Sequence, residues 1–218
     1  MSTISKENYL KTLYTQDKIT ESTVTTSQIA EKLNVTNAAT SEMAKKLSNA
    51  GLVNYQRYKG IELTNEGKKV ALNVLRRHRL WELFLIEVLD LTWDEVHDEA
   101  ELLEHQTSER LIDKIDEFLN FPTFDPHGSP IPKKNGELPD MPELIALSNV
   151  EEGVTYSVAR VSDRNSELIK YFSKIGLTLN KKIKIVEFLT FDNSIVIELD
   201  GTCVTLSEKT ARSVFLKL

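Results

Sequence analysis

This chain of 218 residues has little cysteine and glycine and no long hydrophobic run, and each absence excludes something. Cys203 is the only cysteine, so no disulfide can form within the chain, and its β-prone neighbours predict a buried thiol in a strand. The 8 glycines are scattered, which excludes a glycine-rich loop that cradles a phosphate. Residues 1–7 lack the apolar core of a signal peptide, and no apolar run could cross a bilayer. We therefore expect a cytoplasmic protein with no membrane partner.

Positive charge is scarce overall, but the shortage is confined to one part of the chain. The formal net charge is -6, yet residues 1–80 hold 13 Lys and Arg against 7 Asp and Glu, whereas residues 81–218 hold 14 against 26. A basic amino-terminal part on an acidic body is typical of a protein that touches phosphate with one end only. The length and the 40% hydrophobic content predict one to three globular domains.

The basic part has the order of elements of a winged helix-turn-helix. Apolar residues at helical spacing predict a first helix over residues 5–16, and a capped helix pair follows at 25–33 and 37–50 around a short turn. Two alternating runs, 52–55 and 60–63, then predict a hairpin before the next helix begins. A hairpin after such a helix pair is the expected wing.

The second helix of the pair carries short polar side chains and lysines, which suit base edges and phosphates respectively. A solvated helix face is the plainer alternative, but the basic charge of this part and the hairpin favour DNA. The predicted DNA-contacting residues are Thr26, Ser27, Thr36, Asn37, Ala38, Ala39, Ser41, Glu42, Lys45, Lys46, Arg57 and Lys59.

The middle of the chain is predicted to be helical and the end β-rich. Residues 65–90 predict a long helix with too many apolar residues for one narrow stripe, and helices at 93–106 and 107–119 add more. We expect a partner subunit to cover part of this surface; a core within the chain is the alternative. Five of the six prolines lie in 121–140, an ordered crossing or a linker. Short β-rich runs interrupted by a helix at 166–175 then predict a small closed barrel.

The four histidines all lie in carboxylate-rich stretches between residues 78 and 127. Glu101, Glu104 and His105 are spaced i, i+3 and i+4, which places two carboxylates and one imidazole on one helix face. Without a cation these carboxylates would repel one another, and the set suits a borderline-hard divalent ion. A solvated acidic helix could explain any one of these residues, but the whole set favours a metal site.

Four segments carry a family resemblance in a fixed order. They are 7–14 (ENYLKTLY), 77–82 (RHRLWE), 96–105 with its two histidines, and 126–132 (PHGSPIP). Over essentially the whole chain, the sequence resembles the diphtheria toxin repressor family of metal-dependent transcriptional regulators. The resemblance implies a mainly α-helical protein with a β-rich carboxy-terminal domain: a winged helix-turn-helix at 1–70, a helical dimerisation and metal-binding domain at 71–140, and an SH3-like barrel at 141–218.

The resemblance also implies two metal sites. The first, regulatory site falls on Asn8, Glu101, Glu104 and His105. The second falls on His78, Glu82, His97, Asp125, His127 and, from the barrel, Asp163. In an ungapped alignment of the barrel, Arg160 stands where some family members have a carboxylate.

Three positions bear on the choice of ion. Glu101 stands where iron-type members carry cysteine and manganese-type members carry glutamate, so the site has no sulfur ligand and we expect Mn²⁺. Asn8 replaces the aspartate usual in manganese-type members, which predicts weaker binding or help from Glu7. Fe²⁺ is the alternative, and Zn²⁺ or other divalent ions can occupy such sites in vitro. Lys11 replaces a ligand of the small two-domain manganese regulators, so their paired-metal arrangement is not expected.

The function expected from this reasoning is that of a homodimeric repressor, not an enzyme. It would bind an inverted-repeat operator on double-stranded DNA when metal is bound, and control metal uptake genes. A metal hydrolase is one alternative, since such ligands can activate water, but the chain lacks a recognisable nucleophile motif. A winged-helix regulator with purely structural metal is the other, and DNA binding in chelator would favour it.

Overall fold

The computed structural model describes residues 3–17, 23–56, 59–163 and 166–217, and its chain divides into two compact units. Unit 1 comprises Met1–His78, Leu102–Ser108 and Pro132–Glu137, and unit 2 comprises Arg79–Glu101, Glu109–Ile131 and Leu138–Leu218. Among the helices described, none combines the length and the apolar character needed to cross a membrane.

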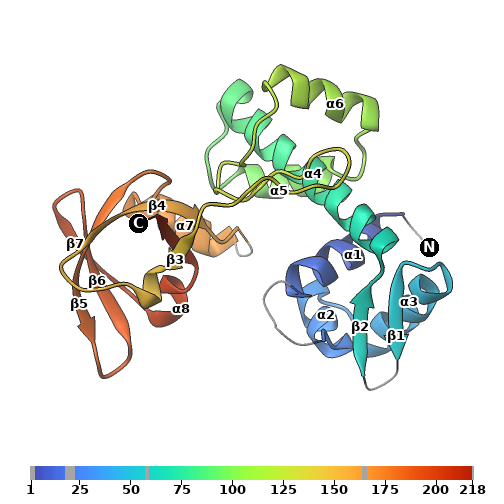
Figure 1. The fold of residues 1–218 in the computed structure, drawn as a ribbon, viewed down its shortest axis with the longest axis horizontal. Helices are drawn as coiled ribbons and strands as arrows, with labels where there is room; N and C mark the ends of the chain where they lie inside the picture. The colour runs from blue at the N-terminus through green and yellow to red at the C-terminus, as the bar shows by residue number, and fades with distance from the viewer. Residues whose placement is uncertain (1–2, 18–22, 57–58, 164–165, 218) are drawn as a thin grey trace. The chain divides into compact units, whose positions relative to one another are not determined.

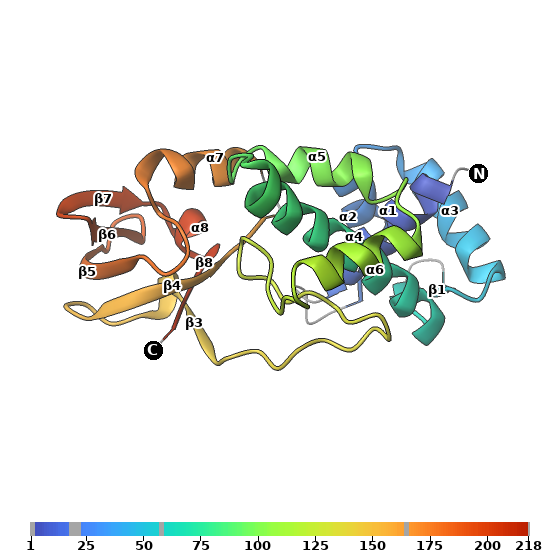
Figure 2. The same ribbon diagram turned by 90° about the horizontal axis from the view of Figure 1, so that it is seen from above.

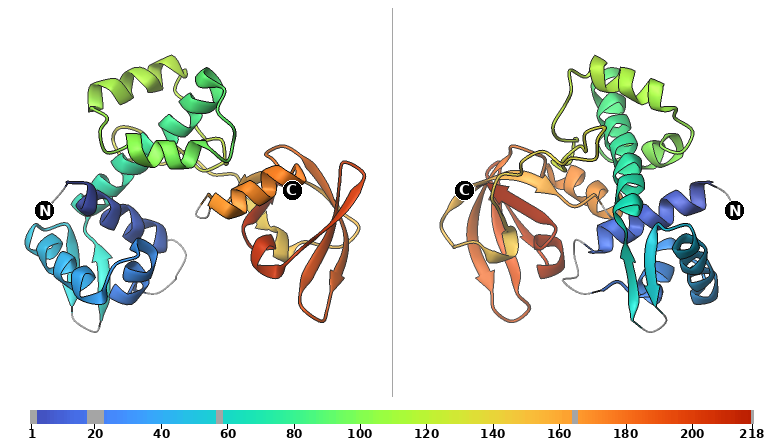
Figure 3. Two further views of the ribbon diagram at one scale, coloured as in Figure 1. Left: turned by 180° about the vertical axis from the view of Figure 1, so that it is seen from behind. Right: turned by 45° about the vertical axis from the view of Figure 1, so that its right-hand side comes forward.

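Unit 1 is built around a winged helix-turn-helix (Figure 1). Its elements are α1 (Thr3–Asp17), α2 (Thr26–Leu33), α3 (Asn37–Asn49), β1 (Val53–Gln56), β2 (Gly60–Leu63) and the first half of α4 (Asn65–Leu89). The two strands pair antiparallel, and β1 lies beside α3 (Figure 3). The predicted winged helix-turn-helix is confirmed, and each of its first five elements ends within two residues of the predicted position.

Local sequence explains the helix pair. The Thr25 side chain accepts a hydrogen bond from the backbone N–H of Gln28, whose own side chain accepts one from the N–H of Thr25 at 2.8 Å, so α2 begins with a capping box. Asn34 ends α2 with φ 51°, and the Thr36 side chain accepts from the N–H of Ala39 to begin α3. The core of this unit is formed by Tyr9, Leu10, Leu13, Val24, Ile29, Ala44, Leu47, Leu52, Val53, Ile61 and Ala71.

The helical part of unit 2 has a small core. Its helices are the second half of α4, most of α5 (Val96–Leu103) and α6 (Glu109–Phe118). α5 is shorter than predicted, because residues 93–95 and 104–106 form turns, and α6 lacks residues 107, 108 and 119 of the predicted helix. Core residues are Leu80, Leu83, Ile112, Ile115 and Ile131. Leu111 and Phe118 on α6 are 48% and 67% exposed, which agrees with the expectation that a partner subunit covers part of this surface.

The rest of unit 2 is a six-stranded antiparallel sheet in the order β3-β8-β4-β5-β6-β7 (Figure 2). Its elements are β3 (Leu144–Ala146), η1 (Leu147–Asn149), β4 (Thr155–Val161), α7 (Ser166–Ile175), β5 (Lys182–Leu189), β6 (Ser194–Leu199), β7 (Thr202–Leu206), α8 (Glu208–Ala211) and β8 (Val214–Lys217). Register shifts at residues 158–160 and 185–187 allow the strands to bend. The predicted SH3-like fold is confirmed, whereas the four-residue helix α8 was not predicted.

The predicted burial of Cys203 is wrong. The residue lies in a strand as expected, but the thiol-bearing side chain is exposed. The reason is that β7 is an edge strand paired only with β6, and of its five residues only Leu206 is buried. β-Propensity predicted the strand correctly but could not show that the strand lies at the edge.

Candidate metal centre

The described residues include two buried clusters of ionisable side chains, one in each unit. The Glu104 cluster of unit 1 consists of Glu7 and Lys11 on α1, Arg77 and His78 on α4, and Glu104 and His105 just after α5. The His127 cluster of unit 2 consists of Glu82 on α4, Asp125 and His127 in the proline-containing crossing, and Asp163 just after β4. Both join residues that are far apart in the sequence, so each depends on the fold.

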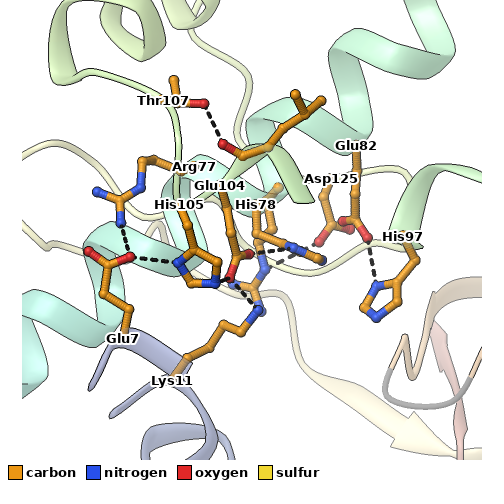
Figure 4. A network of polar contacts seen from close by, with 12 residues as sticks. Glu7, Lys11, Arg77, His78, Glu82, His97, Glu104, His105, Thr107 and Asp125 are labelled. Carbon is orange, nitrogen blue, oxygen red and sulfur yellow. Dashed lines mark hydrogen bonds and ion pairs between the residues drawn. The ribbon is translucent and has the colours of Figure 1, made fainter. Parts of the chain in front are cut away.

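Glu104 lies at the centre of the first cluster (Figure 4). Its side chain is 0% exposed, with Oε1 2.7 Å from the Lys11 Nζ atom and Oε2 2.7 Å from the His78 Nδ1 atom. Burial opposes ionisation of this carboxyl, but His78 and Lys11 outweigh it and hold the pKa of Glu104 below its ordinary value. Glu104 is therefore a buried anion held by an ammonium and an imidazole.

His105 is oriented by a second carboxylate. Its Nδ1 atom lies 2.6 Å from Oε2 of Glu7, and the Nη2 atom of Arg77 lies 3.1 Å from the same oxygen. The Nε2 atom lies 3.1 Å from Oε1 of Glu104 but makes no hydrogen bond within the described part of the chain. An imidazole held at one nitrogen by a carboxylate, with the other nitrogen left over, is typical of a metal-binding histidine.

The remaining residues of the predicted first site are Asn8 and Glu101. Asn8 follows Glu7 on α1, and its side-chain oxygen is buried and accepts no hydrogen bond from the described residues. A buried oxygen of this kind costs about 1–3 kcal/mol unless a donor or a cation satisfies it. Glu101 is half-buried on α5, one helical turn before Glu104. An amide oxygen, carboxylates and an imidazole together form a donor set that fits a divalent cation.

A tight turn presents the ligands of the second cluster. One carboxylate oxygen of Asp125 accepts hydrogen bonds from the backbone N–H of His127 at 2.8 Å and of Ser129 at 2.9 Å. Between them Gly128 has φ +83°, and a Cβ atom there would come within 2.2 Å of the carbonyl oxygen of Ala159. Only glycine therefore lets this turn lie so close to β4.

Contacts with β4 complete the second cluster. The backbone N–H of Val161 donates to the carbonyl of His127 at 2.9 Å, which holds the end of the strand, and hence Asp163, against the turn. Trp93 packs on the His127 ring with 5.1 Å between ring centroids. One ligand atom from each of Glu82, Asp125, His127 and Asp163 lies within 4.8 Å of the others.

The electrostatics of the second cluster also favour a cation. His127 is 0% exposed, and neither ring nitrogen makes a hydrogen bond within the described residues; Oε2 of Glu82 is 3.7 Å from Nδ1. Burial alone lowers the pKa of the imidazole, but Glu82 and the other carboxylates outweigh it and raise the pKa of His127 to about 9. Burial and the charge of Glu82 likewise raise the pKa of Asp125, although Arg79 lies 3.3 Å away.

His78 and His97, which were predicted to share one site, lie close together: one ligand atom from each of His78, His97 and Glu101 lies within 4.8 Å of the others. His97 lies with Glu82, its Nδ1 atom 3.2 Å from Oε1 of that carboxylate. The Nδ1 atom of His78 also lies 2.7 Å from Oε2 of Glu104. The spacing of His78 and Glu82, one helical turn apart on α4, had suggested a common set of ligands.

The acidic residue that the barrel brings to the turn is Asp163. Arg160, which stands where some relatives have a carboxylate, lies with its guanidinium 4.0 Å from the ring centroid of Phe215. A register shift between β4 and β8 occurs at this position.

Sequence reasoning missed the roles of two arginines. Arg77 contacts Glu7 in the first cluster, and Arg79 contacts Asp125 in the second. The alternation Arg77-His78-Arg79 was the available signal, because neighbouring residues on a helix point in different directions and can serve different sites.

The predicted DNA-contacting residues lie on or beside α2, α3 and the hairpin of β1 and β2. Exposed members are Ser27, Thr36, Asn37, Ala38, Ala39, Glu42, Lys45, Lys46 and Lys59, while Thr26 and Ser41 are half-buried. Arg57 lies outside the described residues. The exposed face of α3 therefore presents short side chains at its start and lysines further along, as a recognition helix requires.

Family models match three consecutive parts of the chain. Residues 1–61 match the N-terminal DNA-binding domain of iron-dependent repressors, residues 64–133 match their metal-binding and dimerisation domain, and residues 145–218 match a FeoA domain. The iron-dependent repressor IdeR of Mycobacterium leprae (strain TN) is 32% identical over 222 residues, which cover 95% of this chain and 94% of that protein. The chain belongs to the iron-dependent repressor family.

Solved structures of iron-dependent repressor relatives support the same assignment. A manganese-dependent transcriptional repressor in complex with manganese is 37% identical with a TM-score of 0.88, over 97% of this chain and 98% of that chain. ScaR with bound Zn²⁺ is 33% identical with a TM-score of 0.85, over 97% of this chain and 98% of that chain. Among the sequence relatives, the diphtheria toxin repressor of Corynebacterium efficiens is 35% identical over 127 residues, which cover 58% of this chain and 54% of that protein.

The family assignment decides between the alternatives left open by the sequence. Members are metal-dependent, DNA-binding transcriptional repressors, and so is this chain. The matched domains indicate DNA binding and dimer formation. The family is not one of enzymes, so the hydrolase alternative is set aside.

Proposed function

We propose that this repressor is a homodimer that binds an inverted-repeat operator when divalent metal is held by the Glu104 and His127 clusters. The observation that carries the proposal is a set of buried ligand atoms that make no hydrogen bond within the described residues: Asn8 Oδ1, His105 Nε2 and both ring nitrogens of His127. Buried polar atoms cost free energy unless a partner satisfies them, and a cation would satisfy all of these. We further propose that the protein acts in the cytoplasm and controls metal uptake genes.

The proposed first site uses Asn8, Glu101, Glu104 and His105, with Glu7 orienting the imidazole. Glu104 and His105 follow α5, whereas Asn8 lies on α1, the first helix of the DNA-binding part. Metal held by these residues would tie α1 to the end of α5. Metal can favour the DNA-competent form only if it binds more tightly to that form than to the inactive one. The link between α1 and the end of α5 is therefore the element through which metal would act.

The proposed second site uses Glu82, Asp125, His127 and Asp163. His97 would support it through its contact with Glu82, since an outer partner commonly orients a metal-binding carboxylate. His78 would support both sites, since it contacts Glu104 and also lies close to His97. Asp125 also accepts two backbone hydrogen bonds, so its position is set by the turn whether or not metal is present.

The proposed ion is Mn²⁺, with Fe²⁺ as the alternative. Both sites offer carboxylate and imidazole ligands, the first adds the amide of Asn8, and the only cysteine lies exposed on β7, so neither site has a sulfur ligand. Oxygen-rich sites suit Mn²⁺, whereas thiolates favour softer ions. Zn²⁺ binds such nitrogen and oxygen sites more tightly than either ion, so affinity alone does not identify the physiological metal. The manganese complex of a 37%-identical repressor supports this choice.

The proposed DNA contacts come from the start of α2, the exposed face of α3 and the hairpin. Thr36 to Ala39 would approach base edges at the beginning of α3, and Lys45 and Lys46 would contact phosphates. Two copies related by a two-fold axis would then read an inverted repeat.

The test begins by selecting DNA from a random duplex pool with the purified protein in Mn²⁺, in anaerobic Fe²⁺ and in chelator. Binding of the enriched duplex is then measured by fluorescence anisotropy for the wild type, for Glu104→Ala and for Glu99→Ala, an exposed residue of α5 that serves as the matched control. We expect Glu104→Ala to abolish metal-dependent binding and to remain dimeric by analytical ultracentrifugation, while Glu99→Ala behaves as wild type. Unchanged metal dependence in Glu104→Ala would refute the first site. Wild-type binding that is equal in chelator would leave metal with a structural role only.

A further inference from the structure

Lys11 occupies the Glu104 cluster in a way that the proposed metal site does not explain. Its Nζ atom lies 2.7 Å from Oε1 of Glu104, with the lysine side chain 13% exposed and the glutamate 0% exposed. The two residues are 93 positions apart in the sequence, so the contact joins α1 to the end of α5. An ammonium is a compact point charge, and here it lies against the carboxylate on which the first site is centred.

The geometry brings this ammonium into conflict with a divalent ion. Oε1 of Glu104 lies 2.7 Å from the Lys11 ammonium and 3.1 Å from the Nε2 atom of His105, and Oε2 contacts His78. An ion bound between Glu104 and His105 would therefore lie within a few ångströms of a positive charge. At the effective dielectric constant of a protein this repulsion exceeds the thermal energy several times over.

We propose that Lys11 is a tethered competitor of the metal. In the metal-free protein it neutralises Glu104, and it must leave that oxygen before the ion can bind. Its four-carbon stem can carry the ammonium to solvent by side-chain rotation alone, without a change in the backbone. Lys11 thereby weakens metal binding and raises the metal concentration at which the repressor responds. The inference rests on the proposed first site and adds to it a residue that sets the response threshold.

The test measures Mn²⁺ affinity directly, by competition with a fluorescent chelator. All variants carry Glu82→Gln, which removes a ligand of the His127 cluster so that the first site is measured. The series is Lys11→Met, Lys11→Arg, Glu104→Gln and, as the matched control, Lys6→Met. Lys6 is on the same helix but points about 140° away from Lys11, since successive residues are separated by about 100°.

We expect Lys11→Met to bind Mn²⁺ about tenfold more tightly, because the repelling charge is removed while the stem volume is kept. The Mn²⁺ affinity of Lys11→Arg should stay within about threefold of the Glu82→Gln parent, because the positive charge remains. The Mn²⁺ affinity of Lys6→Met should stay within the same range, because this substitution does not touch the site. Thermal unfolding in chelator checks that each variant is folded. It should show a loss of stability for Lys11→Met that added Mn²⁺ restores.

The outcomes separate this inference from the proposed function. Affinity that is unchanged or weaker in Lys11→Met, while Glu104→Gln loses binding, would overturn the competitor role and leave the metal site intact. Glu104→Gln that binds as tightly as its parent would overturn the first site and the inference with it. Absence of Mn²⁺ binding in both the parent and Lys11→Met would also overturn both.

Discussion

The two clusters solve the same electrostatic problem in different ways. Each buries carboxylates that would repel one another, but the Glu104 cluster places fixed cations against them, Lys11 on Glu104 and Arg77 on Glu7. The His127 cluster relies more on protons. There the pKa of His127 is raised to about 9 and that of Asp125 is raised as well, with Arg79 as the nearby fixed cation.

This difference determines what metal must displace at each place. Metal binding to the Glu104 cluster would displace an ammonium, whose charge remains on the protein. Metal binding to the His127 cluster would displace a proton, which leaves for the solvent. The first exchange therefore depends on side-chain movement and the second on pH. In such a regulator, metal binding at the Glu104 cluster would depend on the metal concentration, whereas metal binding at the His127 cluster would depend on both the metal concentration and the pH.

The largest expected effect of this difference is on the metal-free protein. Glu104→Gln leaves Lys11 and His78 without their buried partner, and breaking one side of a buried pair costs about 3–5 kcal/mol. Glu82→Gln removes one of several crowded carboxylates, and the proton on His127 is no longer needed, so we expect a change within about 1 kcal/mol. Urea unfolding in chelator, followed by circular dichroism, compares the two. Equal losses of stability would contradict the contrast between fixed cations and protons.

The second expected effect is a pH dependence of metal binding at the His127 cluster. His127 must be neutral to bind metal, so below pH 9 the affinity should fall about tenfold for each pH unit. Titration calorimetry in two buffers of different ionisation enthalpy should show that a proton is released when metal binds to the wild type. The His127→Gln variant should not release this proton.

The same raised pKa predicts the stability of the metal-free protein. The pKa of His127 is above its ordinary value of 6.5, so its stabilising contribution is complete below that pH and is lost as the pH rises through about 9. Metal-free stability that instead increased over this range, relative to His127→Gln, would show that burial dominates over the neighbouring carboxylates.

A third effect concerns the amide at the first site. Asn8→Asp adds a carboxylate where a buried side-chain oxygen now accepts no hydrogen bond from the described residues, so Mn²⁺ should bind about tenfold more tightly. In chelator the same change should lower stability, because it adds a partly buried charge next to Glu7 in the sequence. Asn54→Asp, at an exposed position on β1, is the matched control. Equal Mn²⁺ affinity in Asn8→Asp and wild type would remove Asn8 from the site.

The elements were predictable because their signals are local. Caps at Thr25 and Thr36 and the period of the apolar residues located α2 and α3 to within one residue. The helix predicted at 166–175 likewise coincides with α7. Such signals reside in a few consecutive residues, so one sequence is enough to read them.

The partners of the ionisable groups were not predictable in the same way. His78 and Glu82 are one helical turn apart, yet His78 contacts Glu104 and Glu82 contacts His97. The pair of Lys11 and Glu104 spans 93 positions and has no signature in either segment. Asp163 was placed through the family resemblance alone, and the exposure of Cys203 depended on which strand lies at the sheet edge. These features follow from tertiary packing.

The smallest expected effect concerns an ion pair that lies in solvent. Lys46 and Glu42 are 2.5 Å apart on α3, but their side chains are 53% and 66% exposed, so Lys46→Met should change the free energy of unfolding by less than about 1 kcal/mol. If Lys46 contacts a phosphate, the slope of log affinity against log salt should become shallower by about 0.9 in Lys46→Met. Lys11→Met should do the reverse, changing stability and metal affinity while leaving the salt slope of the metal-saturated protein unchanged. A Lys46→Met variant that keeps the wild-type salt slope would place that lysine outside the DNA interface. Lys46 would then only form an exposed ion pair with Glu42 on α3, whereas the substitution of Lys11 acts through the buried carboxylate of Glu104.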